Sequence, residues 1–147
     1  SDTANISKRE NYVGLNAAVK ASKMAYRIAK ILPSTVDVAN VHDCFTIAGI
    51  LATEAIGFAG HGKGADFVLA GNTARDGQIP FNTTGGLIGW GHPTGCTGVH
   101  QAVTLWEQLT GKAGDAQLDI PKDRPYGLSV NMGGDDKTLV SIVYRRG

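Results

Sequence analysis

The spacing of apolar positions along the chain predicts three helices. Gly14 to Ile31 carries apolar residues at three- and four-residue steps among strong helix formers, and Pro33 then ends the pattern. These apolar positions are Ala18, Ala21, Ala25, Ile28 and Ile31. A second apolar run of helical spacing covers residues 45–58. A third covers residues 99–109, and Gly111 follows at the place where a helix C-terminal glycine is expected. The apolar positions expected on the covered face of this third helix are Val99, Val103, Leu105, Trp106 and Leu109. These runs predict amphipathic helices that cover a sheet.

Shorter β-rich stretches lie between and after the predicted helices. One strand is expected to end near Val41, and Tyr126–Met132 and Thr138–Tyr144 predict a hairpin closed by the sequence GGDD with a loop of four or five residues. Residues 65–74 fit either a short helix or an extended segment. The order helix, strand, helix, loop, helix, strand, strand is typical of an α/β layered domain.

Composition agrees with a single domain over residues 1–147, in which residues 1–12 form an arm or loop that packs on another surface. Charged residues make up 18% of the chain, which suggests that another domain or a second subunit, as in a homo-oligomer, covers part of the surface. The formal net charge is +1 and no basic run is present, so nucleic acid is not an expected partner. No apolar stretch approaches the ~20 residues of a membrane span.

Glycine is the residue in excess, at 20 of 147 residues against a usual share of ~7%. Six glycines fall between Asn82 and Gly98, a stretch that also holds a His-Pro pair and Cys96. Such a run indicates tight turns around a site, because glycine lets the backbone approach closely. Cys96 and Cys44 form no disulfide framework and the N-terminus lacks the apolar core of a signal peptide, so free thiols and an intracellular location are expected.

Two short segments carry candidate chemistry, each directly before a predicted helix: His42-Asp43-Cys44-Phe45 and Gly91-His92-Pro93. A helix N-terminus lowers the pKa of a thiol, which would make Cys44 a proton carrier or nucleophile. Cysteine is also a common small buried residue, and a lone histidine can serve only as a structural hydrogen-bond partner. We also expect Asp43 and Asn82 to hold loops through side-chain to backbone hydrogen bonds.

Taken together, these motifs resemble the C-terminal half of thiolases, in particular the sterol-carrier-protein-type branch. The sequence HDCF is followed about 36 residues later by NxxGGxIxxGHPxGxxG, and SVNMGG stands shortly before the last predicted strand. The resemblance implies a layered thiolase-like C-terminal domain, in which helices cover a mixed sheet. It also implies that the first strand of that domain and the N-terminal half of the enzyme are missing from this chain.

The resemblance assigns a role to four residues. His92 activates the nucleophilic cysteine, and His42 helps to hold the thioester oxygen of the reacting acyl group. Cys44 is the acid/base that removes or returns the α-proton of acetyl-CoA, and the backbone N–H of Gly133 contributes to a second oxyanion hole. Further substrate contacts are expected from Phe45, Asn82, Gly91 and Met132.

Two departures from the thiolase pattern limit this interpretation. Asn131 stands where most thiolases carry the acid/base cysteine, and the motif of the nucleophilic cysteine and the loop domain that binds CoA are absent. We therefore expect one part of a fatty-acid β-oxidation type acyltransferase, inactive alone, that cleaves or condenses 3-ketoacyl-CoA once a cysteine is supplied by the N-terminal half. Coenzyme A would be substrate or product, with no further cofactor and no metal.

Three alternatives remain at this point. Relatives of this branch act as retro-aldolases on CoA-linked side chains together with a partner protein, and a catalytically inactive interaction domain is also possible. A metal-binding module is the third, although its residue spacing fits none of the usual zinc patterns. Its ligands would be His42, Cys44, His92 and Cys96.

Overall fold

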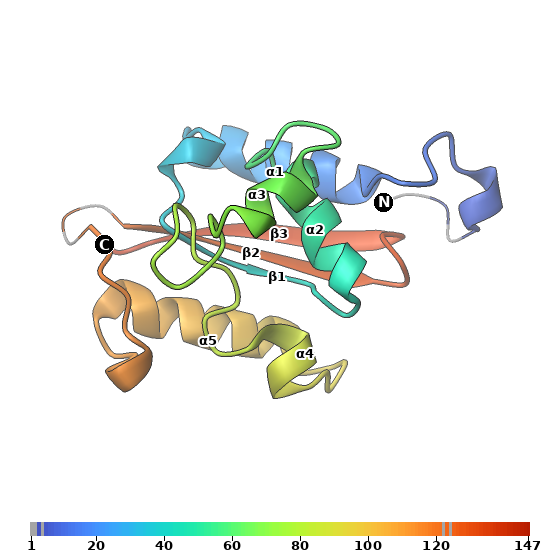
Figure 1. Ribbon diagram of the computed structural model, residues 1–147. Coiled ribbons are helices and arrows are strands. Elements are labelled where there is room, and N and C mark those ends of the chain that lie inside the picture. The colour runs from blue at the N-terminus through green and yellow to red at the C-terminus, as the bar shows by residue number, and fades with distance from the viewer. Residues whose placement is uncertain (1–2, 4, 122, 124) are drawn as a thin grey trace.

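The computed structural model describes residues 3, 5–121, 123 and 125–147, and its centre is a mixed three-stranded sheet between two layers of helices (Figure 1). The strand order is β1 (Val38–Val41), β2 (Tyr126–Gly133), β3 (Thr138–Arg145). β1 and β2 run parallel, whereas β2 and β3 form the antiparallel hairpin that the sequence predicts. All four residues of β1 are buried, as expected for a strand covered on both faces.

One face of the sheet is covered by α1 (Asn16–Ala29) and α2 (Thr46–Ala55), with the short α3 (Gly64–Leu69) beside them (Figure 1). α3 settles the undecided segment as a helix. α1 begins two residues later and ends two residues earlier than predicted. Ile28, which was predicted to lie on its apolar face, is 73% exposed. The face that packs on the sheet is set instead by Ala17, Ala18, Ser22 and Tyr26.

The opposite face is covered by α5 (Thr97–Thr110), preceded by the short α4 (Gly86–Trp90) inside the glycine-rich stretch (Figure 1). α4 was not predicted, because two of its five residues are glycine and the segment carries no helical pattern. α5 ends as predicted at Gly111, whose φ of 73° is left-handed. Three short 3₁₀ helices complete the elements: Ile6–Lys8, Pro33–Thr35 and Gly114–Ala116.

The two faces of α5 differ from the expectation. Val99, Val103 and Trp106, predicted to face the core, are 60%, 46% and 51% exposed. The buried face is largely polar, and its residues are Thr97, Gln101, Thr104, Leu105, Gln108 and Leu109. Most of the polar groups form hydrogen bonds there: Asn40 of β1, for example, donates from Nδ2 to the hydroxyl of Thr104 at 2.6 Å. Oε1 of Gln101 is buried without a partner among the described residues. α5 is therefore apolar on the side that this chain leaves uncovered.

Two hydrophobic clusters hold the layers together. The larger lies between α1, α2 and the sheet, and includes Tyr26, Ile56 and Leu128. The smaller lies under α5 and contains Val38, Leu105, Leu109 and Leu118. Within the described residues, no helix is both long enough and apolar enough to cross a membrane.

Candidate active site

The parallel pairing of β1 and β2 places His42 beside Asn131. Val41, the last residue of β1, pairs with Val130, so the next residue of each strand projects at the same edge of the sheet. Nδ1 of His42 lies 2.7 Å from Oδ1 of Asn131. His42 is only 6% exposed, and burial lowers the pKa of its imidazole, while the hydrogen bond to Asn131 opposes that shift.

His92 reaches the same edge from the loop between α4 and α5. Its ring meets that of His42 edge to face, with centroids 4.9 Å apart and an interplanar angle of 89°. Its Nδ1 lies 2.7 Å from the hydroxyl of Thr97 in the first turn of α5. Because Thr97 is almost fully buried, this contact holds the imidazole in one orientation while the ring itself stays exposed.

Cys44 stands at the start of α2, one residue before its N-cap, Phe45. Its thiol is half-buried, and burial raises the pKa of Cys44, although backbone hydrogen bonds at Phe45 and at Cys44 itself act in the opposite direction. The expectation that the helix N-terminus lowers this pKa was therefore wrong, because desolvation of the thiolate is the larger effect. At neutral pH Cys44 is a thiol, a form that can give a proton.

These side chains surround one cleft of about 510 Å³. Six of the eight residues predicted for the site line this cleft, whereas Asn82 and Gly91 do not. The lining also includes residues that the sequence did not single out. The described residues that line it are His42, Cys44, Phe45, His92, Thr94, Met132, Gly133, Gly134 and Asp135.

Asn82 and Asp43 hold the loops behind the cleft, as predicted. Oδ1 of Asn82 accepts the backbone N–H of Val41 at 2.8 Å, and Oδ1 of Asp43 accepts that of Leu87 at 2.7 Å. Gly86 is required at this point, because its φ is +61° and a Cβ there would collide with the Asp43 carboxylate. The glycine-rich stretch thus folds against the end of β1 and carries His92 to His42.

The β2–β3 turn forms another wall of the cleft and is tied to the N-terminal part of the chain. The buried carboxylate of Asp136 accepts the backbone N–H groups of Ala17 and Ala18 at 2.8 and 3.0 Å. The guanidinium of Arg9, which is 7% exposed, donates to the backbone carbonyl of Asp135. Arg9 therefore anchors the predicted arm to this turn.

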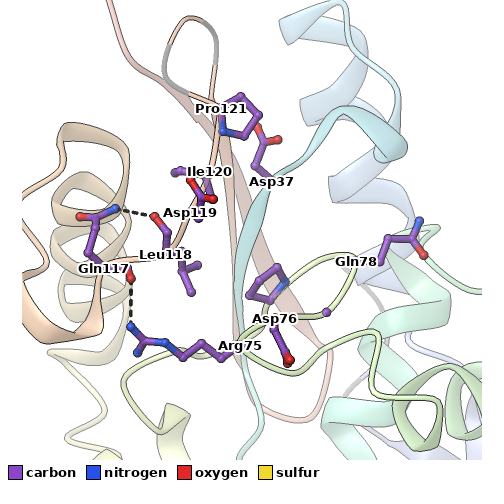
Figure 2. Close-up of a pocket in the computed structure, with 11 residues that line it drawn as sticks. Asp37, Arg75, Asp76, Gln78, Gln117, Leu118, Asp119, Ile120 and Pro121 are labelled. Atoms are coloured by element: carbon purple, nitrogen blue, oxygen red, sulfur yellow. Dashed lines mark hydrogen bonds between the residues drawn. The ribbon is translucent and has the colours of Figure 1, made fainter.

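A larger cavity, of about 760 Å³, lies at the other end of the sheet (Figure 2). Asp37, which precedes β1, and the loop from Leu118 to Pro121 form part of its wall. Two of its charged side chains are already bound to backbone groups: Arg75 donates to the carbonyls of Asp115 and Gln117, and Oδ2 of Asp37 accepts the N–H of Tyr126. None of the described residues that line it is a histidine or a cysteine.

The metal-binding alternative gains no support from the geometry. Across the described ranges, no group of three or more histidine, cysteine, aspartate or glutamate side chains is arranged to hold a metal ion. Cys96, one of the four ligands considered, is an exposed free thiol at the N-cap of α5 and does not line the cleft.

Two contacts within the site went unrecognised in the sequence. Asn131 was noticed only as a departure from the thiolase pattern, and the structure makes it the direct partner of His42. Thr97 was missed, although a hydroxyl five residues after His92, in the first turn of a helix, was a usable signal. Both contacts join segments through tertiary packing, which local patterns do not encode.

The layered sheet with these three loops at one end is the fold of a thiolase-like C-terminal domain. Residues 1–146 match the family model described as "Thiolase C-terminal domain-like", and the chain belongs to this family. The resemblance inferred from the HDCF and GHP motifs is confirmed. The chain is 38% identical over 146 residues to an acetyl-CoA acetyltransferase of Methanothermobacter thermautotrophicus, which covers 99% of this chain and 37% of that protein.

Other relatives agree on the family and on the partial length. Identity to sterol carrier protein 2 of Oryctolagus cuniculus is 36% over 135 residues, covering 92% of this chain and 24% of that protein. The solved structure titled "Ltp2-ChsH2(DUF35) aldolase" matches with a TM-score of 0.70 at 24% identity, over 92% of this chain and 32% of that one. That likeness concerns the fold alone. The chain spans well under half the length of each of these proteins.

Proposed function

We propose that this domain is the C-terminal half of a thiolase that cleaves 3-ketoacyl-CoA with coenzyme A, or forms it by Claisen condensation. The observation that carries the proposal is the convergence of His42, His92 and Cys44 on one cleft at the end of β1 and β2. The 38% identity to a protein named acetyl-CoA acetyltransferase supports it. The nucleophilic cysteine comes from an N-terminal half outside this chain, on the same or a separate polypeptide.

His92 is the base for that cysteine. Its Nδ1 is engaged by Thr97, which leaves Nε2 as the nitrogen that can take the thiol proton. The resulting thiolate attacks the substrate carbonyl, and the covalent intermediate divides one difficult step into two easier ones. The exposed position of His92 fits this role, because the partner half must bring its cysteine to this face.

Cys44 transfers the proton to and from the α-carbon of acetyl-CoA. In the degradative direction, cleavage of the bond between C2 and C3 leaves an acetyl-CoA carbanion, and the Cys44 thiol gives it a proton. In synthesis the thiolate takes that proton back. The raised pKa keeps the group protonated at neutral pH, which favours the first of these steps. Gly133, at the end of β2 beside the cleft, is the proposed backbone donor to the developing oxyanion, a contribution of roughly 3–4 kcal/mol.

The outward face of α5 is the proposed docking surface for the missing half. Val99, Val103 and Trp106 lie there at steps of four and three residues and are 46–60% exposed. A helix that is buried and polar on its sheet side and apolar on its outer side is suited to burial between two layers. Ile88 and Trp90 of α4 are also exposed, at 60% and 43%, and Trp90 stacks on His100 of α5. A homo-oligomer would cover further surface.

The test uses the complete protein, with 3-ketoacyl-CoA and coenzyme A as substrates. We expect cleavage that depends on added coenzyme A and yields acetyl-CoA plus the shortened acyl-CoA, and no activity from the 147-residue chain alone. A complete protein that binds acyl-CoA but never cleaves it would instead be an interaction domain.

A retro-aldol reaction on a CoA-linked side chain is the second candidate, because the same cleft offers proton-transfer groups without a nucleophile of its own. It would release acetyl-CoA without consuming coenzyme A and without a thiol nucleophile. Quantifying coenzyme A consumed per acetyl-CoA formed separates the two reactions, since thiolysis consumes one molecule and retro-aldol cleavage none.

A further inference from the structure

Asn131 touches the site without a role in the chemistry above. It lies on β2, and its Oδ1 is 2.7 Å from Nδ1 of His42, a residue almost completely buried. An amide oxygen can only accept a hydrogen bond, so Nδ1 of His42 must donate. A neutral imidazole carries one proton, and with that proton on Nδ1 the other nitrogen, Nε2, has a free lone pair. No described residue forms a hydrogen bond with Nε2.

Gly98, in the first turn of α5, leaves room for the amide of Asn131 beside His42. A Cβ at Gly98 would lie 2.8 Å from Nδ2 of Asn131, so a larger residue there would displace the amide. The amide oxygen faces His42. Free histidine side chains prefer the proton on Nε2, which means that the contact with Asn131 selects the less common tautomer.

We propose that Asn131 is a positioning residue that keeps the proton of His42 on Nδ1 and so makes Nε2 a proton acceptor in the cleft. This inference rests on the proposed function and changes the part that the thiolase resemblance gives to His42. A neutral ring in this tautomer cannot donate to a thioester oxygen. It can accept a proton from the thiol of coenzyme A.

The proton balance of the thiolytic half-reaction follows from this assignment. The S–H proton of coenzyme A moves to Nε2 of His42 while its sulfur forms a bond to the acyl carbonyl carbon. The bond between that carbon and the enzyme cysteine breaks, and the cysteine leaves as a thiolate. His42, now an imidazolium held by Asn131, passes the proton to the Cys44 thiolate that the first half-reaction left, and the leaving cysteine regains its own proton from His92. No other reactant is required.

The surroundings of His42 keep it neutral for this task. Burial lowers its pKa most strongly, the ring of His92 lowers it further, and Asn131 and Asp43 act in the opposite direction. Among the other titratable groups that line the cleft are Cys44 and Asp135. Activity that needs neutral His42 is present above its pKa and is lost as the pH falls through it.

The first test reads the tautomer directly and does not depend on activity. In the complete protein with ¹⁵N-labelled histidine, the signals that disappear in His42→Gln identify His42 in NMR spectra. We expect the proton on Nδ1 in the wild type and in Asn131→Asp, and a shift toward Nε2 in Asn131→Leu. Gly98→Ala, which displaces the amide but retains Asn131, should give the same shift. Neutral His42 with its proton on Nε2 in the wild type would overturn the inference.

Ser129→Ala is the matched control. Ser129 lies two residues earlier on β2, on the same side of the strand, and contacts Tyr144 instead of a histidine. It should leave the tautomer of His42 unchanged. If Ser129→Ala moved the proton as Asn131→Leu does, the effect would belong to the strand and the specific role of Asn131 would be rejected.

The second test is the pH dependence of kcat/KM for thiolysis. Asn131→Asp should retain most of the activity and move the acidic limb to higher pH, because a carboxylate raises the pKa of His42. Asn131→Leu should lose activity across the whole range. Equal loss in both variants with an unmoved limb would contradict the inference. Absence of coenzyme A-dependent cleavage in the wild type would reject the proposed function, and the tautomer measurement would still decide the role of Asn131.

Discussion

The two ends of the sheet hold cavities of opposite character. The cavity at the amino ends of β1 and β2 has a volume of about 760 Å³, against about 510 Å³ for the cleft at the carboxyl ends (Figure 2). Asp37 and Arg75, which line the larger cavity, already form hydrogen bonds with backbone groups. At the carboxyl ends the side chains of His42 and His92 contact each other and leave one nitrogen each for a substrate. Side chains that keep a nitrogen free for a substrate therefore identify the candidate site better than cavity volume does.

Removing the base at the carboxyl end should have the largest effect. His92→Ala in the complete protein is expected to lower kcat toward the upper end of the ~10²–10⁴-fold range of general acid–base catalysis. Arg75→Ala at the amino end is the matched control and should leave turnover near normal. Steady-state kinetics with a 3-ketoacyl-CoA measures both. A large loss in the control with a small loss in His92→Ala would reverse the comparison.

Removing the thiol at the same end should cost less. We expect Cys44→Ala to lower kcat by about 10²-fold, because water can replace part of the proton transfer to carbon. Cys96→Ala, which removes the exposed thiol outside the cleft, should have no comparable effect. The exchange of α-protons of acetyl-CoA with deuterated water reports on this step. Normal exchange in Cys44→Ala would refute its assignment as acid/base.

The turn that frames the cleft should prove sensitive to the loss of its helix contact. Asp136 is fully buried and accepts two N–H groups at the start of α1. Asp136→Ala should reduce the free energy of unfolding by about 1–2 kcal/mol, as for the loss of an N-cap. Asp136→Asn keeps one acceptor and should lose less. Denaturant titration compares the two variants, and equal stability of Asp136→Ala and the wild type would show that the contact does not hold the turn.

The smallest effect is expected at the amino end. Burial raises the pKa of Asp37, although its hydrogen bond from Tyr126 opposes the shift. The folded state therefore holds the Asp37 proton more tightly than the unfolded state, and the charge costs stability as the pH rises through that pKa. Asp37→Asn keeps an acceptor for Tyr126 and should equal or exceed the wild type in stability at neutral pH. The difference should vanish below about pH 4, where the unfolded carboxyl is also protonated.

Thermal unfolding of the wild type and Asp37→Asn as a function of pH measures this effect. A variant that is less stable than the wild type at neutral pH would mean that the carboxylate of Asp37 has a favourable role at the amino end.

The architecture could be predicted from the sequence because it depends on local patterns. The three long helices, the buried strand and the closing hairpin follow from residue periodicity and turn residues, and each is present. The orientation of α5 could not be predicted in this way. Val99, Val103 and Trp106 have the spacing of a core face, and only the arrangement in three dimensions reveals that this face points away from the sheet. Because the outer side of α5 is apolar and its buried side is largely polar, the sequence pattern alone does not indicate which side faces the sheet.

The residues of the candidate site could be predicted better than the contacts between them. Motifs named His42, Cys44 and His92, and the cleft brings all three together. The contact of Asn131 with His42 depends on the register of two strands 89 positions apart, which no local rule supplies. The pKa of Cys44 was predicted in the wrong direction because the helix N-terminus was visible in the sequence while burial was not.

The most direct test of the central claim locates the covalent intermediate. The complete protein would be mixed with a 3-ketoacyl-CoA, quenched within one turnover, digested and analysed by mass spectrometry for an acyl group on cysteine. We expect the acyl group on a cysteine outside residues 1–147, and we expect His92→Ala to suppress this acylation. An acyl group on Cys44 or Cys96 would contradict the account, and so would turnover without any acyl-cysteine.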